Sequence, residues 1–219
     1  MRNPSESGLG SLPQGNASGG SERAADAPAE LGDARLVELS RSGDDQAYAS
    51  LVARYERKLI RVLVRLVRDE ELARDLAQET FWKVYNRLDR FDTSRRFGPW
   101  LFRVGVNLGL DQLRRQESPL TSSTTLSLSG RRSRSEDSSW EHDPAAADPR
   151  DRMDLAQEVA FILEKIPVAY RTILVLKDLE GFSSAEVATI IGRREATVRW
   201  RLAKARDQFR EHWERRQVD

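Results

Sequence analysis

The sequence predicts an all-α protein in which two small helical domains are joined by a flexible linker, the C-terminal domain being a helix-turn-helix. Apolar residues recur at spacings of three and four over residues 34–116 and 153–216, the period of helices with one buried face, and no convincing strand alternation appears. Residues 1–33 and 117–152 are rich in small and polar residues and poor in large apolar ones. Such segments bury too little surface to offset chain entropy, so we expect a disordered tail and a flexible linker.

Composition excludes several classes of function. The 219 residues include no cysteine, which excludes disulfides, thiolate metal sites and a cysteine nucleophile. The two histidines, His142 and His212, lie among polar neighbours, so we expect no catalytic residue, metal ion or cofactor. No apolar run approaches the ~20 residues of a membrane span, and the N-terminus lacks a signal-peptide pattern. The sequence therefore predicts a cytoplasmic protein without membrane insertion.

Apolar stripes define the helices in order along the chain. In the first domain one stripe follows residues 51–66 and a second follows residues 72–88, and a third helix is expected after Pro99, a residue that suits a first helical turn. In the second domain one helix stops before Pro167, and the next ends at Gly181. The helix-turn-helix follows.

Residues 183–209 carry the clearest local signals. Ser183 is an N-cap residue and Glu186, three residues later, completes a capping box, while Gly192 ends the helix where a positive φ is inexpensive. The next helix carries one apolar stripe, formed by Val198, Leu202, Ala205 and Phe209. Its other faces are basic.

Positive charge is concentrated in this C-terminal segment. Residues 183–216 hold nine Lys and Arg against five Asp and Glu, whereas the whole chain has a net charge of +1. Local positive charge on a helix-turn-helix predicts contact with the phosphates of double-stranded DNA.

Three motifs in order resemble a known family. Residues 75–81 (DLAQETF) look like region 2.2 of the extracytoplasmic-function (ECF) sigma factors of bacterial RNA polymerase, and residues 97–115 (FGPWLFRVGVNLGLDQLRR) resemble its regions 2.3–2.4. Residues 166–206 resemble region 4. The resemblance implies an alternative-type sigma factor, a non-enzymatic subunit that binds core polymerase, recognises −10 and −35 promoter elements and promotes DNA melting. It assigns residues 34–116 to region 2 and residues 153–216 to region 4.

The resemblance also implies which residues meet the polymerase. Region 2.2 docks on the β′ coiled coil, and Asp75, Gln78 and Glu79 match the positions on that side of the helix. The β flap is the second polymerase element implied.

For the −10 element the matching residues are Arg95, Arg96, Phe97, Arg103, Asn107, Arg114 and Arg115. Sites that capture single-stranded bases combine aromatic surfaces with cations along the backbone. The resemblance places a flipped base at Asn107, whose amide offers both a donor and an acceptor to a base edge. Trp100 is equally compatible with the core and with a DNA contact.

For the −35 element the matching residues are Arg194, Thr197, Arg199, Trp200, Ala203 and Lys204. An arginine can contact guanine through two hydrogen bonds. The chain departs from the family at Trp200, where serine is usual. Two interpretations stand: Trp200 contacts thymine methyls, or another element partly covers it.

Two other classes of function compete with this one. A free-standing helix-turn-helix regulator explains the C-terminal segment but leaves the two upstream motifs unexplained, and a requirement for core polymerase before specific DNA binding separates the two. A recombinase needs a nucleophilic Ser or Tyr among arginines, whereas the tyrosines here fall on apolar stripes and the serines concentrate in the tail and linker.

Control by an anti-sigma factor is a further implication of the resemblance. Such proteins insert between the two sigma domains. A flexible linker permits this, because its ends can separate and close again at little entropic cost.

Overall fold

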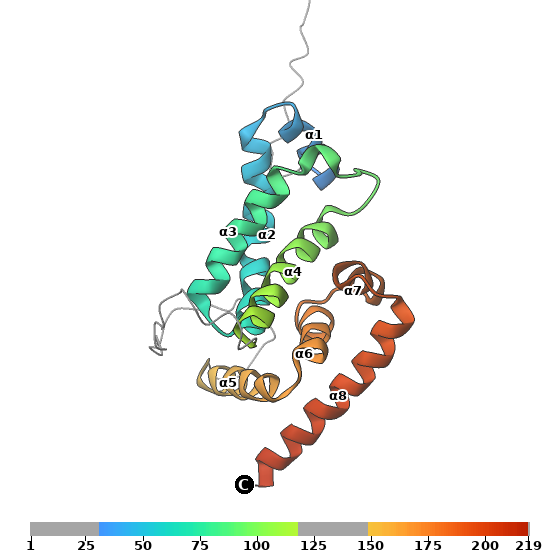
Figure 1. Ribbon diagram of the computed structural model, residues 1–219. Coiled ribbons are helices and arrows are strands. Elements are labelled where there is room, and N and C mark those ends of the chain that lie inside the picture. Colours follow the sequence, from blue (N-terminus) through green and yellow to red (C-terminus); the bar gives the residue numbers. More distant parts are fainter. Residues whose placement is uncertain (1–30, 118–148, 219) are drawn as a thin grey trace, which may run out of the picture.

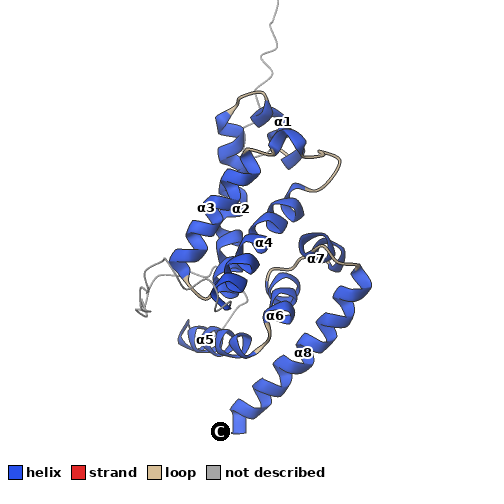
Figure 2. Ribbon diagram, in the orientation of Figure 1, coloured by secondary structure: helices blue, strands red, loops and turns tan. Residues whose placement is uncertain are grey.

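The computed structural model describes residues 31–117 and 149–218, and within them every regular element is helical (Figures 1 and 2). The predicted all-α class is confirmed. The first domain contains α1 (Asp33–Arg41), α2 (Asp45–Val67), α3 (Glu70–Tyr85), the short 3₁₀ turn η1 (Leu88–Arg90) and α4 (Phe97–Glu117). The second contains α5 (Pro149–Lys165), α6 (Val168–Leu174), the π-helical turn η3 (Val175–Leu179), α7 (Ser184–Ile191) and α8 (Glu195–Val218). Most of the predicted disordered tail and flexible linker falls outside the described residues, but residues 149–152, assigned to the linker, form the start of α5, and Glu117 ends α4.

Aspartate caps fix where α2 and α3 begin. The Asp44 side chain accepts hydrogen bonds from the backbone N–H groups of Gln46 and Ala47, which have no intrahelical partner at a helix start. Asp69 caps α3 in the same way. Between the two helices, Arg68 adopts a left-handed conformation with φ 62°, so the chain reverses within two residues and α3 packs along α2.

Helix α4 packs against both α2 and α3, and a glycine permits the close approach. A Cβ added at Gly105 would lie 2.7 Å from Leu59 Cδ1 and 3.2 Å from Thr80 Oγ1. Leu59 and Thr80 are both fully buried. The absent side chain therefore lets the three helices share one core.

The first domain begins one residue earlier than the sequence predicts, with helix α1. Asp33, assigned to the disordered tail, is instead the first residue of α1, and its carboxylate accepts hydrogen bonds from Arg54 at 2.5 Å and from the Tyr55 hydroxyl. Burial and the bond to Asp33 raise the pKa of Tyr55 above its ordinary value of 10.0. A tertiary ion pair of this kind has no local sequence signal.

The second domain confirms the capping chemistry predicted for the helix-turn-helix. The Glu186 N–H donates to Ser183 Oγ at 3.2 Å, and the Ser183 N–H donates to Glu186 Oε2 at 2.9 Å. Gly192 ends α7 with φ +63°. The predicted stripe of α8 packs inward, its buried members being Val198, Leu202 and Ala205.

The two domains touch each other. Helix α7 packs against α4, and α6 and η3 pack against α2 (Figure 1). Helix α8 extends away from this contact toward the C-terminus.

Candidate nucleic-acid interface

The first half of α8 presents a cationic surface opposite its buried stripe. Of the predicted −35 residues, five are exposed and Thr197 is half-buried; the exposed ones are Arg194, Arg199, Trp200, Ala203 and Lys204. Trp200 is 59% exposed, so more than half of its surface is accessible to a ligand. The indole can therefore contact a ligand next to the exposed cations Arg199 and Lys204 on the same helix.

Arg199 is held in place by its own helix. Its Nη2 lies 2.6 Å from Glu195 Oε1 one turn earlier, and the two side chains are 70% and 41% exposed. Exposed pairs of this spacing contribute only ~0.3–0.5 kcal/mol. The guanidinium can therefore exchange this partner for a base edge at small cost.

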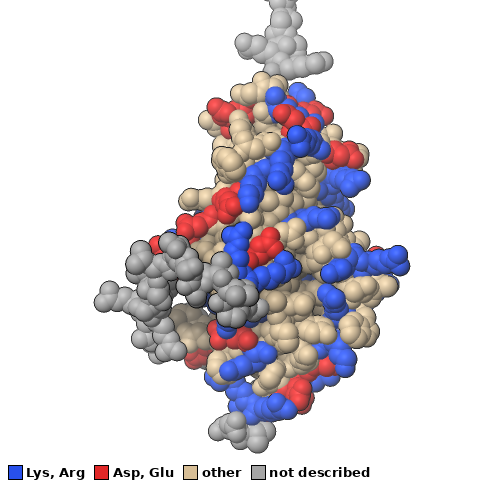
Figure 3. Space-filling model, viewed as in Figure 1, with Lys and Arg blue, Asp and Glu red and all other residues tan. Residues whose placement is uncertain are grey.

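A second cationic surface runs along α4 and the loop before it. The predicted −10 residues that are exposed here are Arg95, Arg96, Arg103, Asn107, Arg114 and Arg115. In Figure 3, basic side chains gather along the side that carries the loop before α4, α7 and the start of α8. Phosphate groups would find several cations within a short stretch of this surface.

Phe97 lies differently from the other residues predicted at this site. Its side chain is 1% exposed and packs against the rings of Tyr55, Phe91 and Trp100 at centroid distances of 5.6, 5.7 and 5.8 Å. In this arrangement Phe97 cannot stack on a base, because its ring belongs to the core. Its position instead fixes the loop that carries the arginines.

Trp100 occupies an intermediate place that the sequence left open. It is half-buried, stacks obliquely on Phe91 at 4.7 Å, and lines a cleft of about 810 Å³ between the loop before α4 and α7. The cleft also carries four arginines, namely Arg90, Arg95, Arg96 and Arg103. An aromatic wall with surrounding cations is the chemistry that single-stranded nucleic acid requires.

Glu186 of α7 lies on the wall of the cleft that faces the arginines, and its carboxylate is hydrogen-bonded and paired. Burial alone would raise the pKa of Glu186, but the hydrogen bonds from Ser183 and the pairing with Arg96 keep it below 4.5. Arg96 Nη1 lies 2.8 Å from Glu186 Oε1. Glu186 therefore stays ionised at neutral pH. Its pairing with Arg96 takes up a guanidinium that a phosphate could otherwise bind.

A third exposed surface lies on α3. Asp75, Gln78 and Glu79 all face outward, and Glu79 pairs with Lys83 at 2.6 Å. Trp82, 67% exposed, was not singled out from the sequence, although it follows Gln78 and Glu79 by four and three residues and so shares their side of the helix. Tyr85 was assigned to a buried stripe, but it is 46% exposed. The surface thus combines polar and aromatic side chains.

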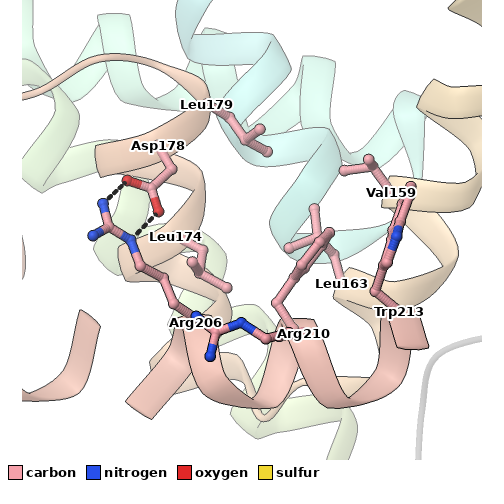
Figure 4. A pocket seen from close by; sticks show the side chains of 9 residues that line it. Val159, Leu163, Leu174, Asp178, Leu179, Arg206, Arg210 and Trp213 are labelled. Atoms are coloured by element: carbon pink, nitrogen blue, oxygen red, sulfur yellow. Dashed lines mark hydrogen bonds and ion pairs between the residues drawn. The ribbon is translucent and has the colours of Figure 1, made fainter. Parts of the chain in front are cut away.

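The second domain also carries an apolar groove that sequence reasoning did not identify (Figure 4). Its volume is about 530 Å³ and it lies between α5, the α6–η3 segment and the second half of α8. The apolar lining residues are Val159, Leu163, Leu174, Leu179, Phe209 and Trp213. At one end Arg206 pairs with both oxygens of Asp178, at 2.7 and 2.9 Å.

Comparison with known proteins decides the family. The model for sigma-70 region 2 matches residues 51–118 and the model for sigma-70 region 4 matches residues 156–209. The RNA polymerase sigma-H factor of Pseudomonas aeruginosa is 32% identical over 180 residues, which cover 80% of this chain and 90% of that protein. The ECF sigma-E factor of Escherichia coli is 32% identical over 181 residues, covering 81% and 92%. The chain belongs to the ECF sigma factors.

Further relatives agree with this assignment. The ECF sigma factor SigW of Bacillus subtilis is 28% identical over 188 residues and matches 80% of this chain and 94% of its own. Among solved structures, CnrH in complex with the cytosolic domain of CnrY is 26% identical with a TM-score of 0.62, covering 83% of this sigma factor and 97% of CnrH. The sigma factor RpoE of Bartonella quintana, 19% identical with a TM-score of 0.56 over 76% of this chain and 96% of that one, shares the fold.

As an ECF sigma factor, the protein is an alternative sigma factor that acts in transcription initiation, binding core RNA polymerase and promoter DNA. Within the described ranges, no helix is long and apolar enough to cross a membrane.

Proposed function

We propose that the three exposed surfaces divide the work of a sigma factor. The outer face of α3 binds the β′ coiled coil, the face of α4 with its preceding loop holds the melted −10 strand, and the first half of α8 reads the −35 element. The observation that carries this division is the pair of separate, exposed cationic surfaces on α4 and α8. Each coincides with the matching motif, and in this proposal residues 34–116 form one functional domain and residues 153–216 the other.

The apolar groove is assigned to the polymerase β flap. It uses the second half of α8, whereas the DNA face uses the first half, so both can be occupied at once. The apolar lining fits a protein partner rather than nucleic acid. In this proposal the protein is a cytoplasmic subunit without catalytic activity of its own.

An anti-sigma factor is proposed as a further partner. The Bartonella quintana RpoE that shares this fold was solved in complex with the anti-sigma factor NepR. An inhibitor that covers α3 or the groove would compete directly with the polymerase.

Co-elution with bacterial core RNA polymerase on a sizing column tests the overall assignment. The proposal requires a stoichiometric complex and promoter-specific run-off transcription. Specific binding to DNA by the protein alone, with no complex with core, would instead make it a free-standing helix-turn-helix regulator.

Replacing Arg199 with alanine is expected to weaken −35 recognition. Loss of a guanine contact costs ~1–3 kcal/mol, or about 5- to 150-fold in the affinity of holoenzyme for a promoter. The measurement is a binding titration of holoenzyme on promoter fragments with intact and altered −35 elements. Arg215→Ala is the matched control, because Arg215 also pairs with a glutamate one turn earlier but lies at the other end of α8. An equal loss in affinity for core polymerase would contradict the division of roles.

Replacing Asn107 with alanine is expected to spare closed complexes and slow melting about tenfold, since one base-edge contact is lost only after the strand opens. Closed complexes are measured by gel shift at low temperature, and melting by the permanganate reactivity of unpaired thymines. An unchanged rate of melting would remove Asn107 from the −10 site.

A further inference from the structure

A buried carboxylate joins the two domains. The Glu180 side chain, which directly follows η3, is only 2% exposed, and its partners belong to α2 of the other domain. Arg61 Nη2 lies 3.2 Å from Glu180 Oε2, and Arg65 Nη1 contacts Glu180 Oε1. Arg61 and Arg65 are one helical turn apart, so both guanidiniums reach the same carboxylate. A carboxylate is stable in such a dry position only while it is paired.

Other contacts make this interface specific. The ring of Phe182 packs on Phe102 with centroids 4.8 Å apart, and Lys58 Nζ lies 4.0 Å from the centre of the Phe182 ring. Arg171, 4% exposed, donates from Nη2 to the Leu66 carbonyl at 2.9 Å. The interface between the domains thus combines apolar packing with directed hydrogen bonds, as the interior of a protein does.

This interface places α7 over part of the surface assigned to the −10 strand. Arg96 is paired with Glu186, and Arg103 Nη1 lies 3.5 Å from the Thr189 carbonyl oxygen. Both partners belong to α7 and form one wall of the cleft beside Trp100. A nucleic-acid strand that entered the cleft would have to displace acceptor oxygens from these two arginines. Asn107 lies outside these contacts, on the exposed face of α4.

We propose that Glu180 is an intramolecular latch: paired with Arg61 and Arg65, it holds region 4 against region 2, so that α7 covers the part of the −10 face that carries Arg96 and Arg103 until the latch opens. The gating half of this proposal rests on the −10 function proposed for α4, whereas the latch itself rests on geometry alone. When only the open form binds the ligand, the apparent dissociation constant equals the intrinsic one divided by the fraction of molecules that are open.

The latch is tested by replacing its carboxylate with a neutral isostere. Glu180→Gln removes the negative charge that Arg61 and Arg65 both contact and keeps the size of the side chain. The variant loses an attraction between the domains that only the closed form has, so the open population should rise at least tenfold. Arg61→Gln, made from the other domain, should act in the same direction. Asp178→Asn is the control, since this carboxylate lies two residues away and pairs with Arg206 within its own domain.

The absence of cysteine allows clean labelling for this measurement. A donor and an acceptor dye are attached at Ala53→Cys on α2 and Glu214→Cys on α8, both exposed and outside the contacts named above. Single-molecule energy transfer in the full chain should show mostly closed molecules, and a shift toward low transfer in Glu180→Gln and Arg61→Gln but not in Asp178→Asn. Circular dichroism verifies that every variant remains helical. Identical transfer in Glu180→Gln and Asp178→Asn would overturn the latch.

Gating is measured on the same variants with a fluorescent single-stranded −10 oligonucleotide. Glu180→Gln should bind it at least threefold more tightly than the parent chain, and Asp178→Asn should not. Opening without a gain in affinity would overturn the gating half. If holoenzyme also fails to bind the oligonucleotide, the −10 assignment of α4 is at fault, and the energy-transfer result still decides the latch.

Discussion

Replacing Phe102 with alanine is expected to destabilise the region 2 domain by about 3–5 kcal/mol, the usual cost of truncating a buried phenylalanine. The side chain is fully buried, with its ring centre 6.4 Å from that of Tyr55 in its own domain and 4.8 Å from that of Phe182 across the domain interface. Truncation removes apolar contacts and leaves a cavity that the surrounding helices cannot fill. Urea unfolding followed by circular dichroism measures the loss.

Phe161→Ala supplies the matched control for this experiment. Phe161 is also helical, but it is 43% exposed, and Lys165 Nζ and Arg216 Cζ lie 5.1 and 4.6 Å from the centre of its ring. Its truncation should cost less than about 1 kcal/mol, the scale of an exposed cation–π contact. A loss that small for Phe102→Ala would mean that burial of this ring does not stabilise the region 2 domain. Because the protein has two domains, the transitions must be resolved before either free energy is assigned.

Features encoded within a few neighbouring residues were predictable from the sequence. The capping box of Ser183 and Glu186 and the left-handed Gly192 require only a ten-residue window, and both occur as expected. The buried stripe of α8 follows from helical periodicity in the same way. In each case the controlling interaction lies within one or two helical turns, so its chemistry is visible in the linear sequence.

Features that depend on distant contacts could not be predicted. Glu180 looks like an ordinary polar residue before a glycine, and its partner Arg61 is 119 positions away along the chain. The burial of Phe97 likewise depends on Tyr55, which the first domain brings close only after α2 and α4 pack. Arg68 ends α2 in a left-handed conformation that glycine usually adopts. Because no glycine stands there, the sequence did not indicate where α2 ends. The motifs therefore locate the site, while the tertiary packing decides which of its side chains are available.

Reversing the charge of Glu79 is expected to weaken binding to core polymerase about 100-fold, or roughly 2.7 kcal/mol. In the proposed division of roles, region 2.2 docks on the β′ coiled coil through the exposed face that Glu79 shares with Asp75 and Gln78. In Glu79→Lys a favourable contact with a basic partner becomes a like-charge contact, and truncating an interfacial charge pair already costs ~2–5 kcal/mol. Helix α3 itself should lose only a few tenths of a kcal/mol, because the pairing with Lys83 is exposed.

The control for this variant is Glu38→Lys on α1. The two glutamates are 47% and 51% exposed, and each pairs with a basic residue within one helical turn. Glu38 lies outside the region 2.2 motif, so its reversal changes the net charge of the chain equally without touching the docking face. Titration of fluorescently labelled core polymerase with each variant gives the two affinities. Equal weakening would show that core binding responds to overall charge, whereas a loss confined to Glu79→Lys would locate the contact on α3 and make Trp82, on the same side of the helix, the next residue to replace.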